Sequence, residues 1–469
     1  MEAPRPSRRQ FLERGLGFVA GLAVAAPTIG RVGSFAGSPQ TARSKLRRPG
    51  SLPHPRMPAG TDTIPQIDHI IVVMMENHSY DNYLGMLGRG DGLRLDKHHQ
   101  PLASNPDTEG NVVHAFRMPT TCQLRRRPST AWNASHISFN GGHNDGFVRA
   151  SGEVAMGYWT AEDLPFYYSL ARNFVLCDRW FGSCLAQTYP NRRFLLAATS
   201  NGLVTNGPPG SPAILAPSPA GGLIFDQLDA HSISWKDYAS DLPTAGLFQS
   251  PLADSSKHLA SIDAYLADAA SGNLPAFALI DPPATKPGSE ENPQNIQVGE
   301  EFVSRVIQAA MSGPAWKKTL LIWCYDEHGG YYDHVPPPRA VKPDNVAPDI
   351  HLPADQPGAF DRYGFRVPAV IVSPYARRGY VSHVTHDHTS ILKLVETKWN
   401  LPALTYRDAN ADDLLDSLDL HHQPRFLEPP KLAAPAMVTN PATCKSGEAG
   451  TIPPPGAVTA KKTPNPTRT

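Results

Sequence analysis

The stretch Ile70-Ile71-Val72-Val73-Met74-Met75-Glu76-Asn77-His78-Ser79-Tyr80-Asp81 decides the fold, because an apolar run stops abruptly at an acid and an amide. Such a run, flanked by turn-prone residues, is typical of a central strand in a parallel sheet. Ligands of open α/β sheets bind at the carboxyl ends of these strands, so we expect Glu76 and Asn77 at a functional edge. Their side-chain oxygens suit a hard divalent cation. Taken alone, however, the pattern is better explained by a strand that ends in a polar loop.

A second stretch repeats this arrangement. The apolar residues 319–325 are followed directly by Asp326-Glu327-His328-Gly329-Gly330. Two apolar strands that both end in carboxylates and histidines are hard to attribute to chance. We therefore predict a metal at the carboxyl edge of the sheet.

Strand and helix patterns alternate along the middle of the chain, which predicts an α/β fold with right-handed crossovers and a parallel sheet. The expected strands are 67–75, 277–280, 319–325 and 367–372, and the expected helices include 81–87, 299–311 and one capped by Asp387 or Thr389 that ends near Trp399. Long Gly/Pro-rich insertions interrupt them at 91–130, 201–222, 282–297 and 336–364. We expect these insertions to build a substrate cleft.

The two ends of the chain differ from its middle. Arg8-Arg9 and the apolar, glycine-rich stretch 15–26 match a twin-arginine export signal, which we assign to residues 1–36 with cleavage after Ala25 or Ala36. The protein is then periplasmic, associated with the cell wall or secreted. We assign the remaining segments as a linker at 37–66, a catalytic domain at 67–428 and a disordered, Pro-rich tail at 429–469.

Charge and cysteine content narrow the function further. The chain has 43 basic and 43 acidic residues, so it lacks the positive charge expected of a nucleic-acid-binding protein. Its five cysteines form no pair of Cys-x-x-Cys motifs. Cys177 and Cys184 are close enough in sequence to form a disulfide after export. The odd total leaves a thiol outside any intramolecular pairing, and Cys444 is a candidate.

A candidate nucleophile lies in Gln187-Thr188-Tyr189-Pro190-Asn191-Arg192. Pro190 suits the first turn of a helix, so we expect Thr188 just before a helix amino terminus. Free amides and the helix dipole attract phosphate at that position. The hydroxyl could attack phosphorus if a metal lowered its pKa. The local sequence alone fits simple helix capping better.

Three separated motifs resemble the signatures of the bacterial phosphoesterase family, which contains phospholipases C and respiratory-burst-inhibiting acid phosphatases. These motifs are residues 76–85, 187–192 and 325–337, and the resemblance continues through Asp387-His388-Thr389-Ser390. It implies an alkaline-phosphatase-like three-layer α/β/α sandwich with a mainly parallel central sheet. It also implies a metal-assisted displacement at phosphorus.

The resemblance further implies a set of site residues. The metal ligands would be Glu76, Asn77, Thr188, Asp326 and Glu327. Thr188 would also be the nucleophile, forming a phosphothreonine that water then hydrolyses. Oxygen ligands favour a hard ion, and calcium or zinc is the most plausible divalent metal.

The departing alkoxide of a lipid needs a proton, so a histidine acid is expected. The candidates are His388, His334, His136 and His328. His388 is our first choice, because the family motif has a histidine there and helix starts face the same edge of the sheet. A structural hydrogen-bonding role remains the alternative for each of them.

Two residues favour the phospholipase branch, since Thr188 and Glu327 replace the serine and aspartate of the acid phosphatases. Many relatives have a His-Pro pair where this chain has Asn292-Pro293, so a group used by those relatives is absent.

We predict an exported, metal-dependent phospholipase C that hydrolyses glycerophospholipids. The alternatives are an acid phosphatase and a non-catalytic, secreted phosphate-binding protein. Expected partners are a phospholipid or small phosphate ester and the twin-arginine export machinery, with at most peripheral membrane contact and no nucleic acid.

Overall fold

The computed structural model describes residues 46–122, 128–207, 213–438, 444 and 451–461. The predicted signal segment, residues 1–36, lies outside them. Among the described residues, no helix is long and apolar enough to cross a bilayer.

The central sheet is built around strand β1 (His69–Met75), the strand predicted from the opening stretch. β1 pairs in parallel with β10 (Thr319–Tyr325) on one side and with β9 (Phe277–Asp281) on the other. Residues 70–75 of β1 are all buried, which explains why the strand is apolar on both faces. The full order is β12 (Val381–Ser382), β6 (Val175–Cys177), β11 (Ala369–Val372), β10, β1, β9, β7 (Trp235–Ala239) and β8 (Leu259–Ala260).

One strand of this sheet runs against the others. β11 is antiparallel to both of its neighbours, β10 and β6, whereas the remaining pairs are parallel. No α-helix or strand lies between Tyr325 and Ala369, so the chain leaves β10 at the carboxyl edge and re-enters the sheet from that same edge. The prediction of a mainly parallel sheet is therefore confirmed, with β11 as the exception.

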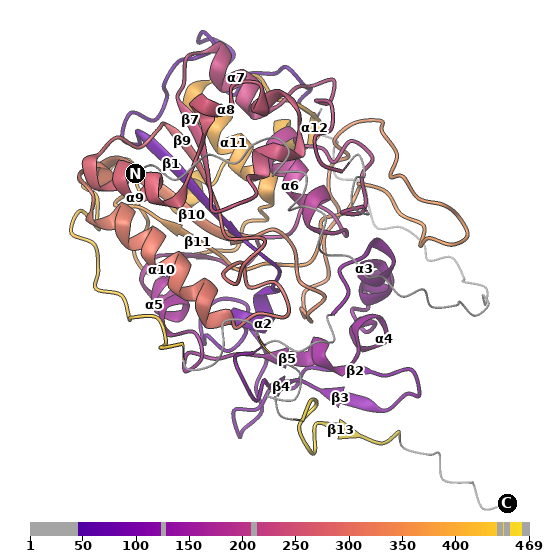
Figure 1. Cartoon of the computed structure of the whole chain (residues 1–469). Helices are drawn as coiled ribbons and strands as arrows, with labels where there is room; N and C mark the ends of the chain where they lie inside the picture. Colours follow the sequence, from indigo (N-terminus) through magenta and orange to yellow (C-terminus); the bar gives the residue numbers. More distant parts are fainter. Residues whose placement is uncertain (1–45, 123–127, 208–212, 439–443, 445–450, 462–469) are drawn as a thin grey trace, which may run out of the picture.

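Helices cover both faces of the sheet and complete three layers (Figure 1). One layer contains α5 (Pro165–Asn173), α9 (Ile262–Ser271) and α10 (Ile296–Ser312). The other contains α6 (Thr188–Ala197), α7 (Ile224–Ala230), α11 (His388–Trp399) and α12 (Tyr406–Ala409). α11 begins as predicted, with Asp387 at its N-cap, and ends at Asn400. The α/β/α sandwich is thus confirmed.

Smaller elements lie below this sandwich in Figure 1 or at its edges. They are the helices α2 (Tyr80–Leu84), α3 (Trp132–Phe139), α4 (Phe147–Ser151) and α8 (Ser255–His258), and the strands β2 (Ser104–Pro106), β3 (Val112–His114), β4 (Phe116–Arg117), β5 (Gly157–Tyr158) and β13 (Val458–Thr459). α2 directly follows the opening stretch, where a short helix was expected.

The carboxy-terminal segment makes contacts that its composition does not predict. Val458 and Thr459 pair with β3, and Cys444 forms a disulfide with Cys122. The expected Cys177–Cys184 pair is wrong, because both of these thiols are free and buried. Cys177 ends β6, whereas Cys184 belongs to a separate apolar cluster with Trp132, so each thiol is buried by different neighbours.

Candidate active site

The carboxyl ends of β1 and β10 bring the two predicted acidic motifs together. Met75, the last residue of β1, is paired in register with Tyr325, the last residue of β10. The amide of Asp326 donates to the carbonyl of Met75 at 3.2 Å, so Glu76 and Asp326 leave the sheet side by side. The parallel pairing of two apolar strands therefore creates the acidic edge that the sequence predicted.

Arg192 is the centre of this edge. Its guanidinium contacts three carboxylates: Asp326 at 3.0 Å, Asp281 at 2.9 Å and Glu76 at 3.3 Å. Arg192 belongs to one of the predicted motifs, but no role was predicted for it, and Asp281 was not predicted at all. A signal was available, since Arg192 lies four residues after Thr188 and thus on the same face of a helix.

Negative charge exceeds positive charge at this edge. Three carboxylates, those of Glu76, Asp281 and Asp326, contact one guanidinium, and a fourth, that of Glu327, lies close enough to interact with Glu76. Burial raises the pKa of Glu76 to about 7, although Arg192 opposes the shift, and burial raises the pKa of Glu327 to about 8. Burial likewise raises the pKa of Asp326. A bound cation would relieve this repulsion and keep the carboxylates ionised.

Asn77 and Thr188 add oxygens to the same place. One terminal atom of the Asn77 amide lies 2.8 Å from Asp326 Oδ1, 3.3 Å from Glu327 Oε1 and 3.5 Å from the Thr188 hydroxyl. If this atom is nitrogen, it donates to both carboxylates. If it is oxygen, four oxygens converge and need a cation between them. This donor set fits a divalent metal, and Arg192 holds Glu76 beside it.

A tight backbone contact fixes Asn77 against the loop after β10. Gly329 has φ +68°, and a Cβ added to it would lie 1.9 Å from the Asn77 carbonyl oxygen. The Gly329 amide also donates to Glu327 Oε2 at 2.8 Å. Glycine is required here both for the left-handed backbone and for the close approach.

Thr188 is the first residue of α6 and is almost completely buried. The loop before it is held by Asn191, whose amide donates to the carbonyls of Ala186 and Gln187, each at 3.0 Å. The amide of Tyr189 donates to Asn206 Oδ1 at 2.8 Å. One of the amides expected to be free for a phosphate is therefore already occupied by Asn206, from the 201–222 insertion.

His388 does not have the geometry expected of the proton donor. Trp180 Nε1 donates to its Nδ1 at 3.5 Å, and its Nε2 donates to the main-chain carbonyl of Asp326 at 2.7 Å. Burial lowers the pKa of His388 to about 4. Because both ring nitrogens bind protein groups, we correct the first choice: His388 holds the backbone of Asp326 in place.

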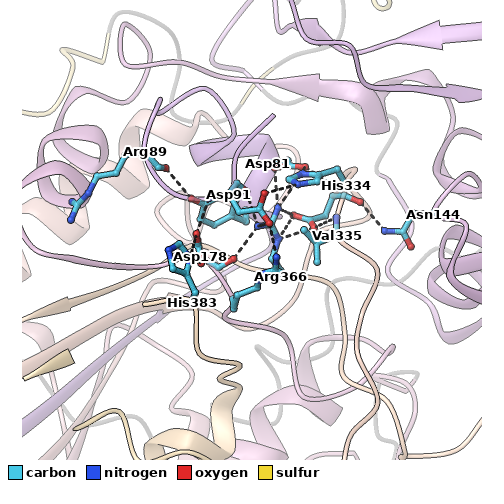
Figure 2. A network of polar contacts seen from close by, with 12 residues as sticks. Asp81, Arg89, Asp91, Asn144, Asp178, His334, Val335, Arg366 and His383 are labelled. Atoms are coloured by element: carbon cyan, nitrogen blue, oxygen red, sulfur yellow. Dashed lines mark hydrogen bonds and ion pairs between the residues drawn. The ribbon is translucent and has the colours of Figure 1, made fainter. Parts of the chain in front are cut away.

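His334 lies in a separate polar network (Figure 2). Its Nδ1 is 2.7 Å from Asp81 Oδ2, and its Nε2 is 3.3 Å from Asp91 Oδ1. Arg366 contacts Asp81 at 3.1 Å and Asp333 at 2.9 Å. Within the described chain, no hydrogen bond or ion pair of His334 reaches the acidic edge. The structure gives His334 a role in joining the loops after β1 and β10.

The other two histidine candidates are His136 and His328. His136 Nδ1 donates to the carbonyl of Trp132 at 2.8 Å, and its Nε2 makes no hydrogen bond within the described residues. Trp132 packs in an apolar cluster with Ala186, two residues before Thr188. His328 Nδ1 lies 3.2 Å from Glu327 Oε2, but burial lowers the pKa of His328 to about 3.

Known proteins are similar to this chain in sequence. The model of the Phosphoesterase family matches residues 67–402. Phospholipase C A of Mycobacterium tuberculosis (strain ATCC 25618 / H37Rv) is 30% identical over 414 residues, which cover 77% of this chain and 79% of that protein. Non-specific phospholipase C1 of Arabidopsis thaliana is 31% identical, covering 78% of this chain and 73% of that protein.

Among solved structures, a protein of the alkaline phosphatase superfamily from Vibrio parahaemolyticus aligns with a TM-score of 0.37 and 10% identity, covering 78% of this chain and 74% of that chain. The family match extends from the start of β1 to just beyond α11 and so includes every residue of the acidic edge. The chain belongs to the Phosphoesterase family and is a hydrolase of phosphoric esters.

Proposed function

We propose that this protein is an exported, metal-dependent phospholipase C that hydrolyses the phosphodiester of glycerophospholipids through a phosphothreonine intermediate. Relatives with about 30% identity over most of the chain are named phospholipase C. The observation that carries the proposal is the place of Thr188. Its hydroxyl lies 3.5 Å from the Asn77 amide, which in turn lies 2.8 Å from Asp326.

The metal would be held by oxygen atoms. Its ligands would be Asn77, Asp326, Glu327 and Thr188, with Glu76 beside them. When bound, a divalent ion would favour the threonine alkoxide and neutralise charge on the phosphoryl oxygens. Arg192 keeps Asp326 and Glu76 oriented, since it contacts both. Calcium and zinc are the ions to test first.

The reaction would proceed in two displacements. Thr188 Oγ1 forms a bond to phosphorus while the bond to the diacylglycerol oxygen breaks, so the phosphorylated head group is left on Thr188. Water then attacks the same phosphorus, the bond to Thr188 breaks, and the phosphorylated head group leaves. In the first step the Thr188 hydroxyl loses its proton and the diacylglycerol oxygen takes one up. In the second step the attacking water loses a proton and the departing Thr188 oxygen takes one up.

We propose His136 as the group that moves this proton. Its Nδ1 is fixed by the Trp132 carbonyl, which leaves Nε2 for exchange with the substrate oxygen. The His136 ring centroid lies 4.1 Å from that of Trp132, and Trp132 belongs to the same apolar cluster as Ala186, two residues before Thr188, which supports a position of His136 near Thr188. His388 and His334 have both ring nitrogens engaged with protein groups.

Export by the twin-arginine pathway is part of the proposal. Arg8-Arg9 precede an apolar segment, and the Cys122–Cys444 disulfide suits an oxidising compartment. Arg8→Lys combined with Arg9→Lys should keep the protein in the cytoplasm, as measured by cell fractionation with a cytoplasmic marker. Undiminished export of this variant would contradict the assignment.

The activity itself is tested with paired substrates. Purified protein is assayed with p-nitrophenyl phosphorylcholine and p-nitrophenyl phosphate, before and after chelation and after calcium or zinc is restored. We expect preference for the diester, loss on chelation and recovery with metal. Preference for the monoester would instead identify an acid phosphatase. If the metal-loaded protein binds phosphate but turns over neither substrate, it is a binding protein.

A further inference from the structure

A second group of potential metal ligands lies outside the acidic edge. His386, Asp412 and Asp416 each contribute one ligand atom, and these atoms lie within 4.8 Å of one another. His386 stands just before α11, whereas the two aspartates follow α12. We propose that these three side chains bind a zinc ion that is separate from the catalytic metal. The proposal does not depend on the proposed function.

The hydrogen bonds around His386 determine which ring nitrogen is available. Ser382 Oγ donates to Asp416 Oδ2 at 2.5 Å, so the hydroxyl proton of Ser382 is already used. His386 Nε2 lies 3.1 Å from Ser382 Oγ and must therefore donate its proton to that hydroxyl oxygen. Nε2 carries the ring proton, and Nδ1 is left with an available lone pair.

This lone pair has no hydrogen-bond partner within the described chain, although the His386 side chain is fully buried. Nδ1 lies 3.4 Å from Asp412 Oδ1 without forming a hydrogen bond to it, so two acceptor atoms lie close together. Asp412 Oδ1 already accepts from the Leu414 amide at 3.0 Å, and a carboxylate oxygen keeps a second lone pair. A metal cation between the two atoms would give Nδ1 the partner that it lacks.

The separations suit zinc in particular. Two ligands that are each about 2.0 to 2.1 Å from a tetrahedral zinc lie about 3.3 to 3.4 Å apart, which matches the Nδ1 to Asp412 distance of 3.4 Å. Asp416 Oδ1 lies 3.8 Å from Nε2, and the three ligand atoms lie within 4.8 Å of one another, so Asp416 would have to move toward Nδ1 to complete the set. One imidazole with two carboxylates is a ligand combination that zinc accepts.

Asp412 also gives the site access to solvent. It forms part of the wall of a surface cavity of about 450 Å³, together with Tyr363, Asn410 and Arg339. The Asp412 side chain is 36% exposed, whereas that of His386 is completely covered. Arg339 is mostly exposed and lies 3.5 Å from Asp361, which offsets its charge. A hydrated ion can enter from the cavity, and a water can occupy the fourth position.

The ion would join the segment before α11 to the segment after α12, next to the acidic edge. The amide of His386 donates to the carbonyl of Arg179 at 3.0 Å, and its own carbonyl accepts from Phe181 at 2.8 Å. Two residues further on, His388 holds the backbone of Asp326. Zinc would therefore tie this supporting segment to the chain after α12, which gives the site a stabilising role.

Asp412→Asn tests the site, with Asp413→Asn as the matched control. Both substitutions remove one negative charge, but the Asp413 carboxylate accepts from the Leu415 amide at 3.3 Å and from Thr397 at 3.4 Å instead of facing His386. The variants are dialysed in zinc buffers, and bound zinc per chain is measured by mass spectrometry together with the zinc-induced rise in Tm. We expect Asp412→Asn to bind one zinc fewer, or to bind it at least about tenfold more weakly, and to lose most of the rise in Tm.

Equal zinc binding by the two variants would overturn the proposal. If Asp412→Asn fails to fold, the wild-type protein still gives a decisive result by zinc X-ray absorption. The ligands proposed for the catalytic metal are all oxygens, so imidazole scattering reports on His386. Imidazole scattering from the zinc-loaded protein supports the site, and a spectrum without it overturns the proposal.

Discussion

Arg192 Nε donates to Asp326 Oδ2 at 3.0 Å, and this contact joins helix α6, which begins with Thr188, to the carboxyl end of strand β10. Thr188 lies one helical turn before Arg192, and Asp326 follows the last residue of β10. The position of the hydroxyl relative to the carboxylates is therefore set by one buried ion pair. This relationship explains why a basic residue lies inside a site that is expected to bind a cation.

Arg192→Met should be strongly destabilising, because it leaves Glu76, Asp281 and Asp326 buried without their counter-ion. Breaking a buried ion pair in this way costs about 3–5 kcal/mol. The free energy of unfolding measured with urea tests this value. Arg172→Met is the control for loss of one positive charge, since Arg172 is exposed and stacks on Tyr168, and we expect a change of less than about 0.5 kcal/mol. Similar stability of the two variants would contradict the account.

Gly329→Ala should abolish activity and destabilise the fold, because the new Cβ would lie 1.9 Å from the Asn77 carbonyl. Gly379→Ala is a matched control: Gly379 has nearly the same φ, +67°, but nothing lies within 4 Å of its added Cβ. The control measures the cost of the left-handed backbone alone, about 1 kcal/mol. Diester hydrolysis and Tm should both fall much further for Gly329→Ala. Equal effects would show that the contact with Asn77 is unimportant.

The disulfide assignment predicts a specific cross-linked peptide. Digestion without reductant should yield one fragment that contains both Cys122 and Cys444, and alkylation after unfolding should label Cys177, Cys184 and Cys324. Removal of the cross-link by the double change Cys122→Ser and Cys444→Ser should lower stability by roughly 2–5 kcal/mol. A linked peptide containing Cys177 and Cys184 would restore the pairing that the sequence suggested.

His334 should stabilise the protein more at low pH than at high pH. Burial alone would lower the pKa of His334, but the hydrogen bond and charge of Asp81 raise it above the usual 6.5. The folded state therefore binds this proton more tightly than the unfolded state. The stabilisation is complete below the unfolded pKa and is lost as the pH rises through the folded pKa.

Urea unfolding of wild type and His334→Gln at about pH 5.5 and about pH 9 measures this dependence. The difference in unfolding free energy should be larger at the lower pH. His383→Gln is the control, because His383 also contacts an aspartate, Asp178, but its side chain is 69% exposed. A pH-independent difference for His334→Gln would contradict the proposed interaction.

The sequence predicted the parts of the fold that depend on local pattern. The apolar runs of β1 and β10 have to be buried on both faces, and the capping residue Asp387 fixes the start of α11. The metal-ligand motifs follow from these strands, because parallel strands deliver their carboxyl ends to one edge. The two strand patterns alone are therefore enough to predict that Glu76 and Asp326 lie at the same edge of the sheet, whereas the structure shows that their strands are neighbours.

Other features depend on contacts between distant residues, which no local pattern encodes. The direction of β11 follows from the path of a loop of more than forty residues between Tyr325 and Ala369. Asn206 reaches the amide of Tyr189 from a separate insertion. His388 lies in the expected motif, but its two ring nitrogens form hydrogen bonds with Trp180 and with the Asp326 carbonyl. Sequence identified His388 but not the groups that it contacts.

The central claim is that Thr188 forms the covalent intermediate, and acid quenching during turnover of p-nitrophenyl phosphorylcholine tests it most directly. Mass spectrometry of the quenched metal-loaded protein should find the phosphorylated head group on the peptide that contains Thr188. Thr188→Val, which keeps the shape without the hydroxyl, should form no adduct and lose at least about 1,000-fold in kcat/KM, whereas Thr188→Ser should retain part of the activity. Near-normal turnover by Thr188→Val, or an adduct on another residue, would contradict the account.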